Sequence, residues 1–386
     1  MKVTNTTIEN ELKKSQVKVI KVDKDNHEIK LENVVFEVLD KNGNVLETIK
    51  TNKNGEAITS RYPIRDFKKL YLRETITNDK YVLDDKIHTI ELKENEIVDY
   101  IFENQKIQGK VKVIKTAEED NKINGDKAGM PIPNVSFGVY DENKNFIEKI
   151  TTDESGIAIT NKLDKGIYYV KELEGENGEW YQLNENEYSA EIVKHGEVAE
   201  LNITNKPDNP EIDVEKDGII QTTANQEIKY DFIIKNTGNV PLDNFTWYDF
   251  LPTDYVTATK LVTGTYNQDL NYAIYYKTNK NDYRLLRDNL NTQVNHYIDF
   301  TNLKLEEGEY VTEFKTEFET VDVGFTSLET PQLFVKTKSK VKDEDTFTNK
   351  TKVDGYHKTY YVWDEDSHTT KVYEKKLEVK LPRTGC

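Results

Sequence analysis

The sequence contains a single cysteine, Cys386, which is the last of its 386 residues. Disulfide frameworks, cysteine-ligated metal sites and internal cysteine nucleophiles are therefore excluded. No apolar run approaches the length of a membrane span. The N-terminal residues 1–14 lack the apolar core of a signal peptide. The six histidines are dispersed, without the spacing of a metal site or a catalytic triad.

Positive charge is also scarce relative to negative charge. The chain has 53 Lys and Arg against 70 Asp and Glu, which gives a formal net charge of −17. Such a chain repels phosphate groups, so we predict no nucleic-acid partner and no anionic membrane surface. The 23 Tyr and 14 Phe are nevertheless spread along the chain, and this aromatic content predicts folded domains rather than acidic disorder.

Motifs typical of enzymes and metal proteins are missing. Two acidic stretches, 23–28 and 364–368, lack the glycine and terminal glutamate of a calcium loop, so turns explain them. No nucleophile–base order, glycine-rich phosphate loop or paired-carboxylate cleft stands out. We therefore predict no metal, no cofactor and no enzymatic activity.

Period-two alternation of apolar residues runs through nearly the whole sequence. Ile228, Tyr230, Phe232 and Ile234 alternate with residues of the opposite face, and turn clusters such as DKNGN, TNKNGE and KNTGN separate the runs. No long stretch has a helical stripe. The pattern predicts an all-β protein made of tandem immunoglobulin-like or prealbumin-like β-sandwich modules in an elongated array.

Internal repeats give the module boundaries. Residues 8–21 align without gaps on residues 102–115, with seven of fourteen positions identical. A third junction covers 203–216, and in all three an Asn precedes a Lys by eleven residues. We interpret each junction as the closing strand of one module, a short linker and the opening strand of the next.

The predicted modules are residues 15–106 (module one), 107–207 (module two) and 208–375 (module three). Residues 1–14 would be the closing strand of a preceding module that is mostly missing, with Asn10 as its last acceptor. Residues 376–386 would form a linker and a sorting signal. On this interpretation, truncation explains why no signal peptide is present.

Polar residues continue the apolar face of particular strands. A Lys does so in each opening strand, an Asn in each closing strand and an acid in the middle of each module. The nine residues are Lys21, Glu74 and Asn104 in module one, Lys115, Glu172 and Asn205 in module two, and Lys216, Asp249 and Asn349 in module three. A single such residue is explained by a strand that frays into solvent. Three matching sets favour burial, which costs several kcal/mol for an isolated polar group.

The order of these segments resembles a known family. Modules one and two resemble the Cna-B type (SpaA/pilin-like) domains of Gram-positive surface proteins and pilins. The resemblance rests on VVFEVLDKNGN, TNKNGEA, YLRET and FENQ in module one, and on VSFGVYDENKN, TTDESGIA, YYVKELEG and ITNK in module two. Module three resembles the larger Cna-A/DUF11-like sandwiches through IDVEKDG, IKYDFIIKNTGNVPLDNFTWYDFLP and FTNKTKV.

The resemblance implies that a buried Lys amine attacks an Asn side-chain carbonyl, releases ammonia and forms an isopeptide bond. Burial favours a neutral Lys and a protonated acid, which polarises the carbonyl and carries protons. The implied sets are Lys21–Asn104 with Glu74, Lys115–Asn205 with Glu172, and Lys216–Asn349 with Asp249. In module three, Asp299 is an alternative acid.

The sequence LPRTG, with Leu381, Pro382, Thr384 and Gly385, matches the sortase motif LPxTG in every fixed position. The match implies cleavage after Thr384 and attachment of Thr384 to cell-wall peptidoglycan. The sequence departs from the family in lacking the apolar span and basic tail that follow this motif. We expect a secreted, wall-anchored protein with sortase and peptidoglycan as partners.

Two functions fit these features. The first is a structural stalk that projects from the Gram-positive cell wall. The second is an adhesin or accessory pilin that binds a host or matrix protein, or other pilin subunits, through module three, which is the richest in Tyr and Trp. No YPK-type lysine motif is present, which favours the stalk or an accessory subunit over a polymerised pilus shaft.

Overall fold

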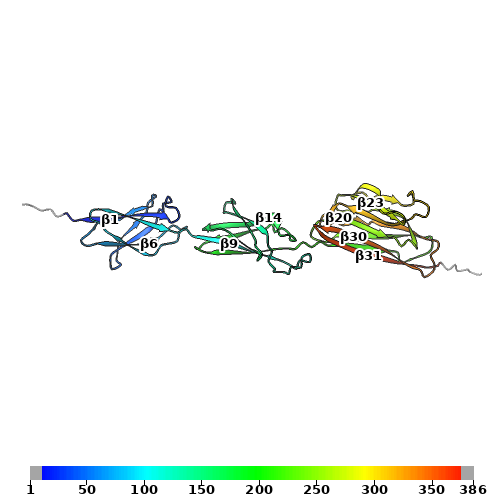
Figure 1. The fold of residues 1–386 in the computed structure, drawn as a ribbon, viewed down its shortest axis with the longest axis horizontal. Helices are drawn as coiled ribbons and strands as arrows, with labels where there is room; N and C mark the ends of the chain where they lie inside the picture. Colours follow the sequence, from blue (N-terminus) through cyan, green and yellow to red (C-terminus); the bar gives the residue numbers. More distant parts are fainter. Residues whose placement is uncertain (1–10, 375–386) are drawn as a thin grey trace, which may run out of the picture. The chain divides into compact units, whose positions relative to one another are not determined.

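The computed structural model describes residues 11–374, and every regular element in that range is a β-strand (Figure 1). This confirms the predicted all-β class. The chain forms two compact units, one with residues up to 120 and 126–206, the other with 121–125 and the residues from 207 onward. Within the described range, no helix is long and apolar enough to span a membrane.

Module one is a sandwich of two four-stranded sheets. The first sheet pairs β1 with β4, β5 and β8, and the second has the order β3-β2-β6-β7. The strands are β1 (Lys14–Asp23), β2 (Val35–Leu39), β3 (Val45–Lys50), β4 (Glu56–Ile58), β5 (Tyr62–Pro63), β6 (Lys69–Ile76), β7 (Ile87–Glu91) and β8 (Ile97–Asn104). Alternate residues of β1 are buried, as the period-two pattern requires.

Module two repeats this arrangement strand for strand. Its first sheet pairs β9 with β12, β13 and β16, and its second has the order β11-β10-β14-β15. The strands are β9 (Gln108–Ala117), β10 (Val135–Tyr140), β11 (Phe146–Thr151), β12 (Ile157–Ile159), β13 (Leu163–Asp164), β14 (Gly166–Asn177), β15 (Glu187–Ile192) and β16 (Val198–Asn205). The repeat in the sequence therefore corresponds to a repeat in topology.

The first and last strands of modules one and two are parallel neighbours. β1 pairs with β8 over eight residues from Gln16↔Ile97 to Asp23↔Asn104, and β9 pairs with β16 in the same way. A parallel pair needs a long connection, and here that connection is nearly the whole module. The first and last strands of each module thus lie side by side.

Module three is a larger sandwich with its own core. A five-stranded sheet, β17-β19-β29-β21-β25, faces a sheet of eight strands that runs β18-β31-β30-β20-β26-β23-β24, with β27 beside β20. The first sheet contains β17 (Ile212–Gly218), β19 (Glu227–Asn236), β21 (Val256–Val262), β25 (Tyr297–Asp299) and β29 (Gln332–Thr337). The second contains β18 (Gln221–Thr222), β20 (Leu242–Phe250), β23 (Asn271–Thr278), β24 (Arg284–Asn291), β26 (Val311–Phe318), β27 (Thr320–Val321), β30 (Thr346–His357) and β31 (Tyr360–Val372). A separate short pair joins β22 (Thr265–Tyr266) to β28 (Ser327–Glu329).

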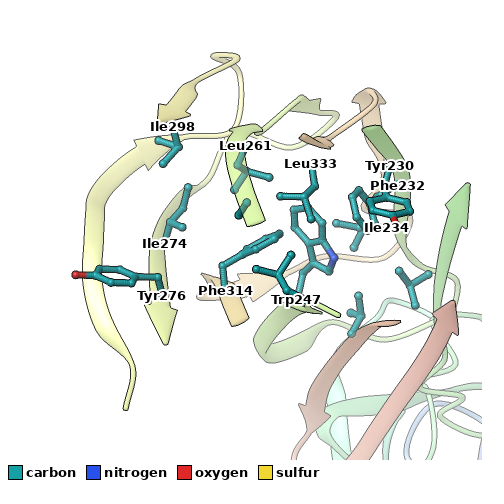
Figure 2. Close-up of a cluster of buried hydrophobic side chains, with 14 of the residues drawn as sticks. Tyr230, Phe232, Ile234, Trp247, Leu261, Ile274, Tyr276, Ile298, Phe314 and Leu333 are labelled. Carbon is teal, nitrogen blue, oxygen red and sulfur yellow. The ribbon is translucent and has the colours of Figure 1, made fainter. Parts of the chain in front are cut away.

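Aromatic side chains fill the core of module three. Trp247 lies between Phe232 and Phe314, with ring centroids 4.8 and 5.2 Å away (Figure 2). All three rings are almost completely buried, and edge-to-face contacts of this kind add to the stabilisation from burial alone. The aromatic content that favoured an adhesive surface in this module is therefore partly internal, because tyrosines such as Tyr230 and Tyr266 also belong to the core.

The end of module three differs from the ends of modules one and two. The sequence pattern placed Asn349 on a closing strand, but Asn349 lies on β30, and the hairpin partner β31 follows it. The two strands pair antiparallel over twelve residues, from Thr346↔Lys371 to His357↔Tyr360. Val372, the last residue of β31, is buried against the core.

Two glycines hold turns against the opening strands. Gly55 and Gly156 have φ angles of 71° and 69°, in the left-handed region that favours glycine. Their carbonyl oxygens accept hydrogen bonds from the backbone amides of Lys21 and Lys115, at 2.7 and 2.8 Å. A Cβ at either glycine would lie 2.4 Å from the carbonyl oxygen of the same lysine.

This geometry predicts that Gly55→Ala destabilises module one more than Gly43→Ala does. Gly43 has a φ of +86°, but no atom lies within 4 Å of the position that a Cβ would take, so its substitution costs only the left-handed strain of about 1–2 kcal/mol. Gly55→Ala adds displacement of β1, roughly a further 1–3 kcal/mol. Native-state hydrogen exchange of the β1 amides would measure both effects, and equal losses of protection would contradict the prediction.

Candidate functional site

All nine polar residues predicted on apolar faces are buried. None of the nine is more than 7% exposed, and Lys21 and Lys115 are among the largest fully buried side chains of the described residues. The alternative in which these residues lie at frayed, solvated strand ends is therefore wrong. In each module the structure brings the lysine, acid and asparagine into one cluster, which we term a triad.

The module two triad has a compact geometry. Lys115 Nζ lies 2.5 Å from Asn205 Oδ1 and 2.8 Å from Glu172 Oε2. Asn205 Nδ2 donates a hydrogen bond of 2.6 Å to Glu172 Oε1. The carboxyl group therefore contacts the amine with one oxygen and the amide nitrogen with the other.

The module one triad has similar distances, but Glu74 Oε2 contacts Lys21 without the geometry of a hydrogen bond. Lys21 Nζ lies 2.6 Å from Asn104 Oδ1 and 2.7 Å from Glu74 Oε2, and Asn104 Nδ2 lies 2.6 Å from Glu74 Oε1. Thr77 Oγ1 also accepts from Asn104 Nδ2, at 2.7 Å. Thr77 was not among the predicted site residues, because its position after β6 has no part in the period-two pattern.

Strand register explains how these side chains meet. In the parallel pairing of β9 and β16, Lys115 is opposite Ile203, and Asn205 lies two residues further along the same face. Diagonal neighbours of this kind are within reach of long side chains. Glu172 comes from β14 in the opposite sheet, so the acid approaches the lysine and asparagine across the core.

The module three triad is built from different strands. Asp249 and Asn349 lie on the neighbouring strands β20 and β30 of the eight-stranded sheet, and Lys216 reaches them from β17 in the five-stranded sheet. Lys216 Nζ contacts both Asn349 Oδ1 and Asp249 Oδ2, and Asn349 Nδ2 donates to Asp249 Oδ1 at 3.0 Å. Here the lysine–asparagine contact joins the two sheets, whereas in modules one and two it joins neighbouring strands.

The alternative acid of module three does not belong to this site. Asp299 is exposed at the end of β25, where its carboxylate accepts hydrogen bonds from Thr301 and Asn302. These hydrogen bonds, led by that of the Thr301 hydroxyl, lower the pKa of Asp299. An exposed carboxylate that stays ionised cannot act as a buried acid, so the geometry favours Asp249.

Burial shifts the pKa values of the three lysines and of two of the acids in the directions that attack by a neutral amine requires. Desolvation lowers the pKa values of Lys21, Lys115 and Lys216 below the usual lysine value, although the acids oppose the shift. Desolvation also raises the pKa values of Glu172 and Asp249. Both shifts favour the neutral pair, in which the amine is unprotonated and the carboxyl holds the proton.

Each amine has one or two aromatic rings as neighbours. Lys21 Nζ lies 5.8 Å from the ring centroids of both Phe36 and Phe102, and Lys115 Nζ lies 5.7 Å from that of Phe137. In module three the Tyr230 and Phe232 centroids are 4.6 and 4.4 Å from Lys216 Nζ. These rings were not predicted as parts of the sites, although they follow the same alternation.

One contact differs from the arrangement that the family resemblance implies. The resemblance assigns the carboxyl to the asparagine carbonyl oxygen, which it would polarise. In all three triads the carboxyl contacts Nδ2 instead, and the oxygen faces the lysine. The carboxyl is therefore placed between the nucleophilic nitrogen and the nitrogen that would leave.

Several predicted residues lie outside the described range. The sorting-motif residues Leu381, Pro382, Thr384 and Gly385, together with Asn10, fall in segments 1–10 and 375–386. Between residues 11 and 374, no group of three or more His, Cys, Asp and Glu side chains is placed to hold a metal ion.

Comparison with known families identifies the first two modules. Residues 15–106 and 109–207 each match the family described as SpaA, prealbumin-like fold domain. They are tandem prealbumin-like domains. No curated protein matches the chain in sequence.

Solved structures similar to the chain include two pilins. The Bacillus anthracis TIE protein is 17% identical with a TM-score of 0.43, and the match covers 94% of this chain and 50% of that one. The full-length major pilin SpaD from Corynebacterium diphtheriae is 14% identical over 68% of this chain and 67% of its own, with a TM-score of 0.27. A streptococcal ancillary pilin is 22% identical over 50% and 62%, with a TM-score of 0.23. The chain thus spans half the length of the B. anthracis protein.

The buried acid predicts a pH dependence once its amine is removed. In Lys115→Met the Glu172 carboxyl stays buried, and burial raises its folded pKa above the unfolded value. The contribution of this carboxyl to the free energy of unfolding is then fully present below its unfolded pKa. It is lost as the pH rises toward its folded pKa. We expect urea unfolding of module two to show a loss of up to about 1.4 kcal/mol per pH unit above about pH 4.3.

The double variant Lys115→Met/Glu172→Gln provides the matched control. It lacks the titrating carboxyl at the same buried position, so its stability should not follow this slope. If the single and double variants had the same pH profile, the carboxyl would not be desolvated as described.

Proposed function

We propose that the chain is a structural stalk of a Gram-positive cell surface, whose three modules each form an internal Lys–Asn isopeptide bond. The bonds are Lys21–Asn104, Lys115–Asn205 and Lys216–Asn349, and they follow the division into residues 15–106, 107–207 and 208–375. The observation that carries the proposal is the triad itself, which occurs once in each of three separate apolar cores. The same contacts recur in modules of two different topologies. This recurrence favours a chemical role for the triad over structural coincidence.

The chemistry is an amide exchange in which the acid returns to its starting state. The neutral lysine Nζ attacks the asparagine Cγ, and the bond from Cγ to Nδ2 breaks. The carboxyl donates its proton to the departing Nδ2 and accepts one from Nζ, so that ammonia leaves and the new amide remains neutral. A carboxyl that contacts both nitrogens is suited to this transfer, and the surrounding rings exclude water from it.

The products would give durability to a chain without disulfides. The bonded residues are separated by 83, 90 and 133 positions. By the loop-entropy relation used for disulfides, each closure stabilises its module by about 4–5 kcal/mol. In modules one and two the bond also ties together the parallel first and last strands, so tension passes between them without separating the sheet.

In this proposal, the LPRTG motif attaches the stalk to the cell wall. Sortase would cleave LPRTG after Thr384 and transfer the carboxyl of Thr384 to peptidoglycan. The acidic surface suits a hydrated extracellular protein, and covalent cross-links would replace disulfides in stabilising it. The prealbumin-like family match supports a surface or pilin-type role.

Intact-mass measurement tests the cross-links directly. We expect the wild-type chain to weigh three ammonia molecules less than its sequence requires. Lys21→Met, Lys115→Met and Lys216→Met should each restore one ammonia relative to the calculated mass of the variant. Glu172→Gln should restore one as well, because it removes the proton carrier and leaves the nucleophile in place.

A lysine outside the triads supplies the control. Lys112 lies on β9 beside Lys115 but points outward and pairs with Glu200, so Lys112→Met should keep all three deficits. A wild-type chain of full calculated mass would refute the cross-links, and a deficit that survived Lys115→Met would refute the assignment in module two.

The sorting signal can be tested separately from the cross-links. Incubation with purified sortase and a triglycine peptide should join the peptide to Thr384 and release Gly385 and Cys386. Thr384→Ala should abolish the product without changing the ammonia deficits. Mass spectrometry of the C-terminal peptide would detect the product, and an unreacted wild-type chain would count against wall anchoring.

A further inference from the structure

The outward face of the eight-stranded sheet in module three contains a cavity of about 720 Å³. Residues of β20, β23, β24, β26, β30 and β31 line it, so the cavity spans most of the sheet. Thr246 and Tyr248 of β20 line it and alternate with the buried Trp247 and Asp249. The cavity is thus on the opposite side of the sheet from the triad and is independent of it.

Side-chain size explains why the sheet is hollow here. Thr246 and Ala273 both pair with Glu317 and lie in one cross-strand row. The next row holds the larger Tyr248 and Tyr275, which both pair with Lys315. Small residues in one row and tyrosines in the next produce a depression with an aromatic wall.

Lysines hold these tyrosine rings in place. Lys352 Nζ lies 5.7 Å from the Tyr248 centroid, and Lys315 Nζ lies 5.1 Å from the Tyr275 centroid. The same lysines pair with carboxylates of the cavity, Lys352 with Asp354 at 2.8 Å and Lys315 with Glu317. Each ring therefore has a cationic neighbour, and two of the cavity's carboxylates are already paired.

Two asparagines stand at irregular points of the cavity's rim. Asn244 and Asn289 both have a φ of 53° and line the cavity. Asn244 lies where the β20–β30 register shifts, and Asn289 where the β23–β24 register shifts. A bulge changes the direction in which a side chain points. Glycine would adopt these φ angles without strain, yet both positions carry an asparagine.

We propose that this cavity binds a neutral oligosaccharide. Tyrosine faces stack on the apolar C–H faces of sugar rings, while amides and carboxylates hydrogen-bond to hydroxyl groups. Asp288 and Glu319 also line the cavity and repel sulfated or carboxylated sugars. The carboxylates of Glu317 and Asp354 are already paired with lysines, so a cationic ligand would find only Asp288 and Glu319 as partners. A neutral, hydroxyl-rich ligand leaves the existing charge pairs in place.

Glycan binding by the full chain tests this proposal. The labelled protein, applied to an array of neutral, sulfated and sialylated glycans, should bind neutral oligosaccharides selectively. Calorimetry with the strongest of these should show that Asn244→Gly, Asn289→Gly and Tyr275→Ala each weaken binding by at least about ten-fold, as expected for loss of a positioned contact. Tyr275→Phe should retain binding, because the ring face remains.

The glycine substitutions separate binding from folding. Glycine suits a φ of 53°, so Asn244→Gly and Asn289→Gly should leave the thermal unfolding of module three unchanged or improved. Asn225→Gly is the matched control, since Asn225 has a φ of 61° but does not line this cavity. No binding to any neutral glycan, binding only to charged glycans, or equal binding by the wild type and the cavity variants would each overturn the proposal.

Discussion

A lysine amine can remain in an apolar core only if its positive charge is removed or matched, and this constraint shapes all three modules. Each amine has one carboxyl and one amide within contact distance. The acid is itself almost completely buried, so bulk water solvates neither group. Removing the acid alone would leave the buried amine without its charge partner, and loss of one partner of a buried ion pair costs about 3–5 kcal/mol.

Two different topologies meet this constraint with the same atomic contacts. In the prealbumin-like modules, Lys and Asn are diagonal neighbours on parallel strands and the acid crosses the core. In module three the acid and Asn are neighbours, and the lysine crosses the core. In all three triads one carboxyl oxygen contacts Nζ and the other contacts Nδ2, so the local chemistry is preserved although a different member of the triad spans the sandwich.

Much of this arrangement could be predicted from the sequence because burial in a sandwich follows a period of two. Lys21 and Lys115 continue faces begun by valines, and their repeated spacing from Asn10 and Asn104 revealed the junctions. Contacts made by residues that lie outside the strands could not be predicted from this period. Thr77, for example, follows β6 and meets Asn104 only because the folded chain brings the two residues together. The choice between Asp249 and Asp299 depended on which strand faces β17, which only the sheet order determines.

The strand β31 changes how module three would respond to a pull along the chain. With Lys216 bonded to Asn349, the covalent loop ends on β30, and β31 lies outside it. β31 is retained by its pairing with β30 and β18 and by the carboxylates of Asp364 and Asp366, which accept hydrogen bonds from the amides of Val214 and Lys216. Under sufficient tension this strand would slide away while the looped core stayed closed. Extension would then stop at Asn349, where the covalent loop closes. In modules one and two the bonds would end on Asn104 and Asn205, the last residues of β8 and β16, so no strand of those modules would lie outside its loop.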